Sequence, residues 1–225
     1  MSATGSLAAF NGLALLLAAY MLVRHGRRGL LFVAPGLVRV AGDREAPPAT
    51  PGQLRAGENL SRLGFSRLGA RREDGPLGGL RLGTDAWANE REGAFADVFD
   101  QAPRGGGPPW AYFLSPFPDG ALVLTANHPR LALSTDRFLT GGLPGSSLEA
   151  TFAAHRKAVE RFAGRHGAPT ARADLAARLE LARAWYRGPG RRELRRLFFV
   201  HFVNSLAAIA LAAGSAIYLV RALRT

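Results

Sequence analysis

Two long apolar stretches without any charge stand near the two ends of this chain, and they constrain its fold more than any other feature. The first covers residues 7–23 and the second covers residues 197–220. A helix needs about 20 apolar residues to cross a hydrocarbon core that is about 30 Å thick, and it satisfies its backbone hydrogen bonds internally. The sequence therefore predicts two transmembrane helices, with residues 24–196 between them.

Arginines stand on the inner flank of both stretches. They follow the first stretch and precede the second, at Arg24, Arg27, Arg28, Arg191, Arg192, Arg195 and Arg196. An excess of Lys and Arg close to membrane ends marks the cytoplasmic side. We therefore expect a multi-pass protein of the cell's inner membrane, with the N- and C-termini outside and the middle domain in the cytoplasm.

A cleaved signal peptide is the alternative interpretation of the first stretch. Such a peptide carries positive charge before its apolar run and small residues at the cleavage site. Here residues 1–6 are uncharged, and the run ends in Tyr20, Met21, Leu22 and Val23 before the first arginine. The sequence therefore favours a membrane anchor that is retained.

The formal net charge of +12 is unevenly distributed. Residues 149–196 contain twelve basic and five acidic residues, and of all 29 basic residues only Lys157 is not an arginine. A basic surface beside a membrane attracts anionic lipid headgroups. Alternatively, the same arginines, Arg187 included, only determine the topology and bind no ligand. Both interpretations stay open. Membrane lipids are thus expected partners, and a protein partner in the membrane or cytoplasm is a further expectation.

Several partner and site classes are excluded or disfavoured. The chain has no cysteine, which excludes disulfides, thiolate nucleophiles and cysteine-ligated metals. No nucleic-acid recognition motif accompanies the basic residues, so we expect no nucleic-acid partner. Glycine-rich phosphate loops and nucleophile elbows are also missing from the sequence. We expect no cofactor and no metal site.

The residues between the two stretches predict an α+β domain. We expect a juxtamembrane segment and linker at 24–51, the cytoplasmic domain at 52–190, and a basic segment at 191–223 that continues into the second transmembrane helix. A helix should begin with Thr50 as its N-cap and Pro51 in its first turn. Further helices should follow Ser147 and Thr170, and we expect Asp174 and Arg178, one turn apart, on the solvent-facing side.

Short apolar runs bounded by Gly, Pro and Asp predict strands in the middle of this domain. They cover residues 77–82, 94–99, 110–117 and 121–125, and the last two should form a hairpin that turns at Pro118, Asp119 and Gly120. The expected fold is a helix, a mainly antiparallel sheet of about four to five strands, and then helices.

Few side chains suggest chemistry. His128, Asp119 and His155 would form the site of a membrane-bound enzyme if the fold brought them together. His155 also lies on the apolar stripe of its predicted helix, where a histidine is usually a hydrogen-bonded core residue. His25 and His201, near the inner ends of the two stretches, would be axial ligands if the chain bound haem.

Small residues inside the apolar stretches predict that the two helices pack against each other. Ala8/Gly12, Ala14/Ala18, Ala208/Ala212 and Ala210/Gly214 all have the spacing that lets helix backbones approach closely in a membrane. Alanine-rich filler is the alternative. From all these observations we expect a non-catalytic two-span membrane protein that presents a cytoplasmic interaction or assembly domain close to the membrane, with the enzyme and the haem subunit as alternatives.

Overall fold

The computed structural model describes residues 3–48, 50–100 and 108–222. These residues fold into two compact units. The first, called the helical unit below, comprises Met1–Val38, Asp74–Leu80 and Tyr186–Thr225, and the second, called the α+β unit, comprises Arg39–Glu73 and Arg81–Trp185. The helices are α1 Ala3–Val33, η1 Pro35–Leu37, α2 Pro51–Arg62, η2 Pro76–Gly78, α3 Leu148–His166, α4 Leu175–Arg187 and α5 Gly190–Ala222.

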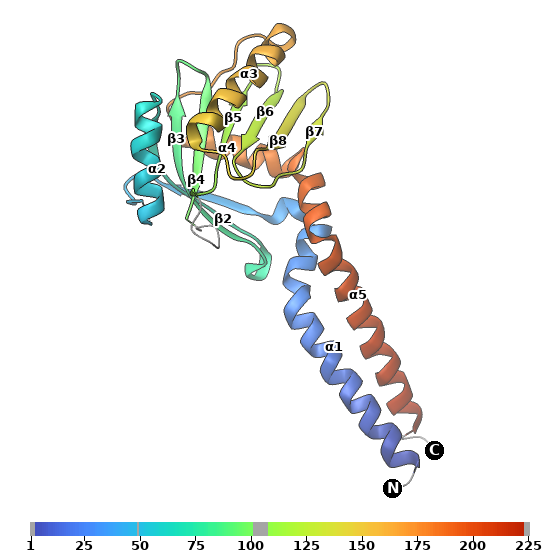
Figure 1. Ribbon diagram of the computed structural model, residues 1–225. Coiled ribbons are helices and arrows are strands. Elements are labelled where there is room, and N and C mark those ends of the chain that lie inside the picture. The colour runs from blue at the N-terminus through green and yellow to red at the C-terminus, as the bar shows by residue number, and fades with distance from the viewer. Residues whose placement is uncertain (1–2, 49, 101–107, 223–225) are drawn as a thin grey trace. The chain divides into compact units, whose positions relative to one another are not determined.

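The α+β unit is built on a mixed sheet of eight strands within the described residues, more than the four to five that the sequence predicts (Figure 1). The strand order is β1-β2-β3-β4-β5-β6-β8-β7. Neighbours from β3 to β6 pair antiparallel, and β6 pairs with β8 in parallel. The strands are β1 Arg39–Asp43, β2 Ser66–Asp74, β3 Arg81–Asn89, β4 Ala94–Phe99, β5 Ala111–Pro116, β6 Leu122–Ala126, β7 Leu133–Ser134 and β8 Phe138–Gly142.

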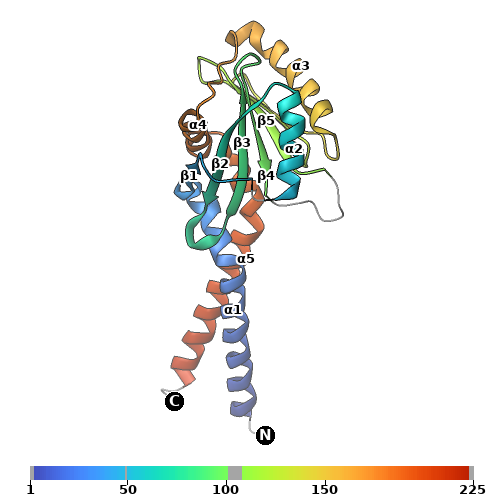
Figure 2. The same ribbon diagram turned by 90° about the vertical axis from the view of Figure 1, so that its left-hand side faces the viewer.

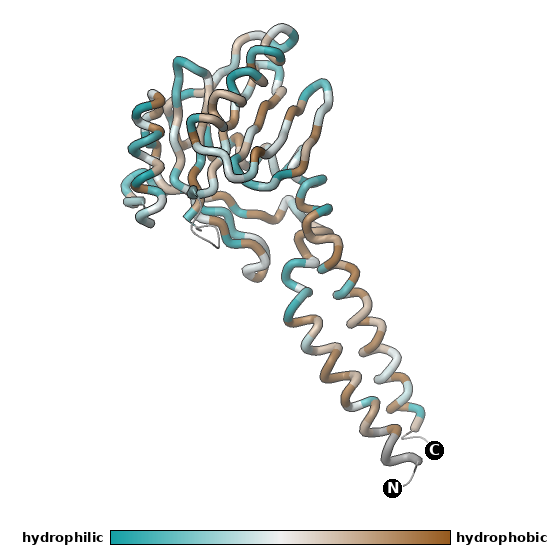
Figure 3. Tube along the Cα trace, in the orientation of Figure 1, coloured by the Kyte–Doolittle hydropathy of each residue, from teal (hydrophilic) through white to brown (hydrophobic). Residues whose placement is uncertain are grey.

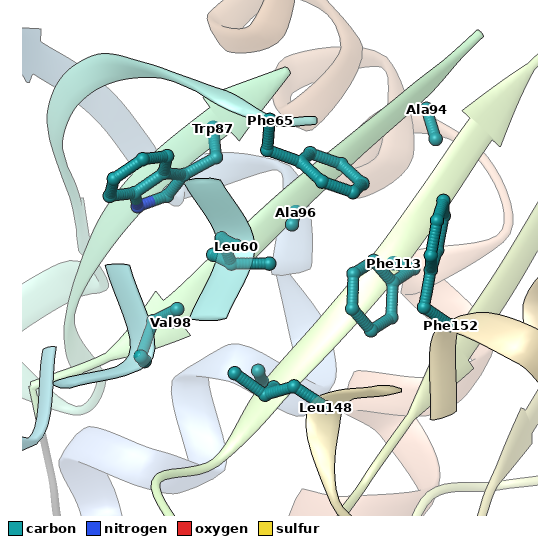
Figure 4. Packing of buried hydrophobic residues seen from close by; sticks show 11 residues of the cluster. Leu60, Phe65, Trp87, Ala94, Ala96, Val98, Phe113, Leu148 and Phe152 are labelled. Atoms are coloured by element: carbon teal, nitrogen blue, oxygen red, sulfur yellow. The ribbon is translucent and has the colours of Figure 1, made fainter. Parts of the chain in front are cut away.

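Helices cover both faces of this sheet, with α2 and α3 on one face and α4 on the other (Figure 2). Under α2 and α3, Leu60, Trp87, Phe113 and Phe152 pack into a buried cluster (Figure 4). The phenyl ring of Phe65 meets that of Phe152 edge-on, with 5.0 Å between ring centroids. The face that α4 covers holds a second apolar cluster and, as described below, a group of charged side chains. Two helix layers thus enclose the sheet.

Local signals in the sequence place two helix starts correctly. Thr50 and Gln53 form a reciprocal capping box at the start of α2, and Ser147 accepts a hydrogen bond from the amide of Ala150 at the start of α3. Thr170 is not the cap of α4, because that helix begins at Leu175 and the Asp174 side chain accepts hydrogen bonds from the amides of Ala176 and Ala177.

The strand predictions succeed where the chain is apolar. Strand β4 has the expected bounds, and the hairpin of β5 and β6 turns at the expected residues, with Gly120 at a φ of +82°. The strand expected at 77–82 is wrong at its start, because Pro76–Gly78 forms a turn of 3₁₀ helix and β3 begins only at Arg81. Strand β2 is missed because its buried positions include Arg71 and Glu73.

The helical unit consists mainly of α1 and α5, which lie side by side with the chain termini at the same end (Figure 1). Both helices are long and apolar enough to cross a membrane, and Figure 3 shows the apolar residues along them. Helix α1 does not end at the arginines after residue 23 but continues to Val33. Residues 24–33, expected to be part of a juxtamembrane segment, are therefore helical.

Candidate functional site

Part of the seam between α1 and α5 is made of small and polar side chains. Ala14 and Ala18 of α1 are buried, as are Ser205, Ala208 and Ser215 of α5. Side chains this small allow the two backbones to approach closely, which is how helices pack where no hydrophobic effect drives their association. Packing therefore accounts for the Ala14/Ala18 pair of the sequence.

Gly29 is the closest point of the seam. A Cβ atom at this position would lie 2.8 Å from Ser205 Oγ and 3.4 Å from both the His201 carbonyl oxygen and the Phe202 Cα. At Gly12, by contrast, a Cβ would meet no atom within 4 Å. These two glycines of α1 thus differ, since Gly29 lies in close contact with α5 whereas Gly12 does not contact it.

His25 and His201 meet across this seam. Their Nδ1 atoms are 2.8 Å apart and their ring centroids 4.9 Å. At this distance one nitrogen donates and the other accepts, so the pair holds one proton between the two rings. The structure therefore brings together the two residues that the haem hypothesis nominates, but in direct contact with one another. A porphyrin between them would first have to separate the rings.

Nine arginines of the helical unit are exposed within the described residues, and we call eight of them, all except Arg221, the flanking arginines. They are Arg24, Arg27 and Arg28 of α1, Arg187 at the end of α4, and Arg191, Arg192, Arg195 and Arg196 in the first two turns of α5. All eight residues are exposed, and Arg24 also donates a hydrogen bond to the Tyr20 hydroxyl. Their charges are therefore available to a ligand or to the solvent.

In the α+β unit, a group of charged side chains is buried between the sheet and α4. Asp97 of β4 is fully buried and forms ion pairs with Arg71 of β2 and Arg178 of α4. Arg71 also pairs with Glu73, and the Tyr112 hydroxyl accepts hydrogen bonds from both arginines at 2.7 Å. Two cations and two anions thus share one buried site.

Electrostatics within this group follow from its geometry. Burial by itself would raise the pKa of Asp97, but the guanidinium groups of Arg178 and Arg71 outweigh it and hold that pKa below its ordinary value. Burial also raises the pKa of the Tyr112 hydroxyl, which therefore stays protonated. The Asp97 carboxylate therefore stays ionised and the Tyr112 hydroxyl stays neutral, so the arrangement is suited to holding β2, β4 and α4 together.

Sequence reasoning missed this group, and it placed Arg178 on the wrong side of its helix. The expectation of a solvent-facing pair with Asp174 is wrong, since Arg178 is only 1% exposed and Asp174 pairs with Arg44 instead. A signal existed, because Arg178 stands three residues after Leu175 and four before Ala182. Both of these are buried, so helical periodicity places Arg178 on the same face.

His155 lies on the opposite face of the sheet, inside the core. Its Nε2 is 3.0 Å from the Ser115 Oγ and its Nδ1 is 3.1 Å from the Thr125 Oγ1, and all three side chains are buried. Burial lowers the pKa of His155 to about 3. The imidazole is therefore neutral and uses both nitrogens to satisfy hydroxyl groups of β5 and β6.

The other two enzyme candidates have partners of their own. Asp119, in the hairpin turn, accepts a hydrogen bond from His166 Nδ1 at 2.8 Å, which lowers the pKa of the carboxyl group. His128 packs against Phe99 and Trp110, and burial lowers its pKa. Each of the three candidate residues thus interacts with different groups, and the described contacts do not join them into one site.

Two further observations bear on chemistry. Among the described residues, no group of three or more His, Asp or Glu side chains is arranged to hold a metal ion. No protein-family model matches the chain, and comparisons with curated proteins and with solved structures give no match either. The features of the molecule that bear on its function are therefore the paired helices α1 and α5 and the flanking arginines.

Proposed function

We propose that this chain is a two-span membrane protein whose α+β unit is a non-catalytic cytoplasmic interaction or assembly module. One observation carries the proposal. Helices α1 and α5 expose large apolar side chains along their length, for example Phe10, Leu16, Val203 and Ile217, each at least 43% exposed. The largest exposed apolar patch of a soluble monomer usually covers about 300–600 Å², and two helices of 31 and 33 residues with such surfaces exceed that.

Lipid is the environment that fits these surfaces. A core helix of a soluble protein would be buried on several sides, whereas α1 and α5 bury only the narrow seam between them. At about 1.5 Å per residue, either helix is longer than the hydrocarbon core of about 30 Å. We place the membrane spans at residues 7–23 and 197–220, so that the flanking arginines lie just outside the hydrocarbon.

The same arginines orient the hairpin in this proposal. Both helices carry their arginines at the end that leads into the α+β unit, apart from Arg221. Since cytoplasmic flanks carry the excess of Lys and Arg, the α+β unit belongs in the cytoplasm and both termini belong outside.

Orientation can be tested by cysteine labelling, because the natural chain has no cysteine that would react. We would introduce Ser6→Cys before the first span and, separately, Ser134→Cys at an exposed position of β7. In intact spheroplasts, a membrane-impermeant maleimide should label the cysteine at position 6, and the cysteine at 134 only after permeabilisation. The cysteine-free chain is the control, and the reverse labelling pattern would contradict the proposal.

The module itself can be tested by photo-crosslinking in native membranes. In the α+β unit, Leu54 and Trp110 are large apolar side chains that are 55% and 38% exposed, so they are suitable positions for a photoreactive amino acid. The same amino acid at Asp136, an exposed polar position, is the matched control. A discrete, stoichiometric adduct at the apolar positions supports the module, and a chain that remains solitary at every position counts against it.

A further inference from the structure

We propose that the flanking arginines form a binding surface for the phosphate groups of anionic phospholipids. This proposal rests on the proposed function, since it requires α1 and α5 to lie in a bilayer. It names a specific ligand for the helical unit, and it gives the arginines a binding role in addition to their role in setting the topology.

The first argument is the distribution of charge. The three segments of the helical unit contain ten arginines and only two carboxylates, Asp74 and Glu193. This unit therefore accounts for most of the net charge of +12. Arginines that are spread over a surface are usually interspersed with acidic residues, whereas these are concentrated in the part of the chain that carries the apolar helices.

The second argument is the register of the two helices, which gathers the arginines at one end of the hairpin. His25 contacts His201, and the Phe32 ring stacks on that of Phe202 with centroids 4.3 Å apart. Beyond α1, a Cβ at Gly36 would lie 3.7 Å from an Arg191 guanidinium nitrogen. Arginines from both helices therefore lie within a few helical turns of the same level.

The helical unit also includes a support for the end of α1. Segment Asp74–Leu80 belongs to this unit, and a Cβ at Gly79 would collide with the backbone carbonyl of Arg27. A Cβ at Gly75 would lie 3.1 Å from the Leu31 side chain, which is fully buried. The backbone that carries Arg27 and Arg28 is thus packed on one side, while both side chains remain exposed.

The third argument identifies phospholipid as the ligand. Large apolar side chains are exposed within a turn of the arginines, namely Tyr20, Leu30, Leu197, Phe199 and Val200. A surface that alternates guanidinium groups and exposed apolar groups matches the boundary between phosphates and acyl chains, and arginine binds phosphate through two parallel hydrogen bonds. An acidic protein would satisfy the arginines but would leave this apolar surface uncovered.

The experiment measures lipid retention by the full-length protein. The purified chain is passed through mixed micelles that contain equal amounts of phosphatidylglycerol and phosphatidylcholine, and the lipids that remain bound are counted by native mass spectrometry. We expect preferential retention of phosphatidylglycerol. Each arginine near an anionic surface contributes about fivefold in binding at low salt, so Arg27→Gln, Arg28→Gln, Arg191→Gln and Arg192→Gln combined should abolish the preference. Higher salt should weaken it.

Two variants separate this proposal from its alternatives. The same four positions changed to lysine keep the charge but lose the paired hydrogen bonds, so they should retain an intermediate amount of phosphatidylglycerol. Arg55→Gln, Arg72→Gln, Arg165→Gln and Arg172→Gln remove the same charge from exposed positions of the α+β unit and should retain as much as the natural chain. Equal retention by all variants, or equal retention of both lipids, would overturn the proposal and leave an acidic protein as the ligand to seek.

Failure of the membrane proposal would look different. A chain that is not membrane-embedded would be extracted from membranes by alkaline carbonate, whatever its lipid preference. A chain that resists carbonate but shows no preference for phosphatidylglycerol would refute only the lipid-binding surface.

Discussion

Asp97 is the residue on which the interior of the α+β unit depends most. It is fully buried and pairs with Arg71 and Arg178, whose side chains are also buried. Replacing it by Asn would leave two guanidinium groups without their shared counter-charge in a site that water does not reach. Breaking a buried pair from one side costs about 3–5 kcal/mol of folding stability.

We therefore expect Asp97→Asn to lower the free energy of unfolding by that amount, as measured by urea denaturation of the full chain in detergent with tryptophan fluorescence. Asp136→Asn makes the same chemical change at an exposed position, where substitutions usually change stability by less than about 0.5 kcal/mol. Equal effects of the two substitutions would show that the buried pairs do not stabilise the unit.

His155 predicts a dependence of stability on pH. Its pKa is about 3 in the folded chain and about 6.5 in an unfolded one, so between these values the unfolded chain binds a proton that the folded chain does not. Its contribution to stability is complete above pH 6.5 and is lost as the pH falls toward 3, by up to about 1.4 kcal/mol per pH unit.

This contribution can be isolated by substitution. His155→Gln removes the titrating group and keeps a side chain that can hydrogen-bond to Ser115 or Thr125. Urea denaturation at pH 7 and pH 5 should show a smaller loss of stability for the variant than for the natural chain. An identical loss would mean that His155 titrates normally in the folded state.

At the scale of elements, the pairing of α1 with α5 depends on a glycine. Gly29→Leu would place its side chain against Ser205 and the backbone of α5, whereas Gly12→Leu would meet no atom within 4 Å of its Cβ. We expect Gly29→Leu to separate the helices near His25 and His201 and Gly12→Leu to leave them in place.

The separation can be measured by crosslinking. With His25→Cys and His201→Cys in the otherwise cysteine-free chain, a short bismaleimide should link the two helices. The yield should fall severalfold when Gly29→Leu is added and should be unchanged with Gly12→Leu. A similar yield in all three proteins would show that the close approach at Gly29 does not hold the helices together.

The elements that could be predicted from sequence are those governed by local signals. Thr50 and Ser147 cap helices because a side-chain oxygen before a helix satisfies amides of its first turn, and β4 is recognised from its apolar residues. Strand β2 could not be recognised, because Gly69, Arg71 and Glu73 occupy its buried positions. The partner of Arg71, Asp97, lies on β4, and no local pattern indicates that pairing.

The same limit explains the outcome for the candidate site residues. Periodicity places His155 on an apolar face, but its partners Ser115 and Thr125 come from β5 and β6. The contact between His25 and His201 depends on the register of two helices that are about 175 residues apart in the sequence. The flanking arginines, by contrast, can be recognised directly from the sequence, because most of them stand next to the two apolar stretches.

At the scale of the whole molecule, the proposed topology implies that the two sets of arginines provide the same orientation signal twice. Each span has its own cytoplasmic flank in the proposed topology, so neither set should be necessary by itself. We expect Arg24→Gln, Arg27→Gln and Arg28→Gln together to leave the orientation unchanged, because the four arginines before the second span still retain the α+β unit in the cytoplasm.

Neutralising both sets of arginines should produce a mixture of chains in the two opposite orientations. Labelling of Ser134→Cys in intact spheroplasts measures this directly, since only inverted chains react. Lysine at all seven positions is the control and should preserve the orientation, because the effect depends on charge. Complete inversion by the first set alone would show that the second span carries no orientation signal.

The hydrogen bond that Asn11 makes within its own helix has a consequence for synthesis of the chain. The segments that complete the helical unit lie far apart in the sequence, and Tyr186 follows Val38 only after the whole α+β unit. At about 5–20 residues per second, a ribosome needs on the order of 10–30 s to make that interval. In the proposed topology, the first span has no partner helix in the bilayer during this time. Asn11 donates a hydrogen bond from its side-chain amide to the Leu7 carbonyl oxygen at 2.9 Å, so the most polar side chain of the proposed first span already has a partner before α5 is made.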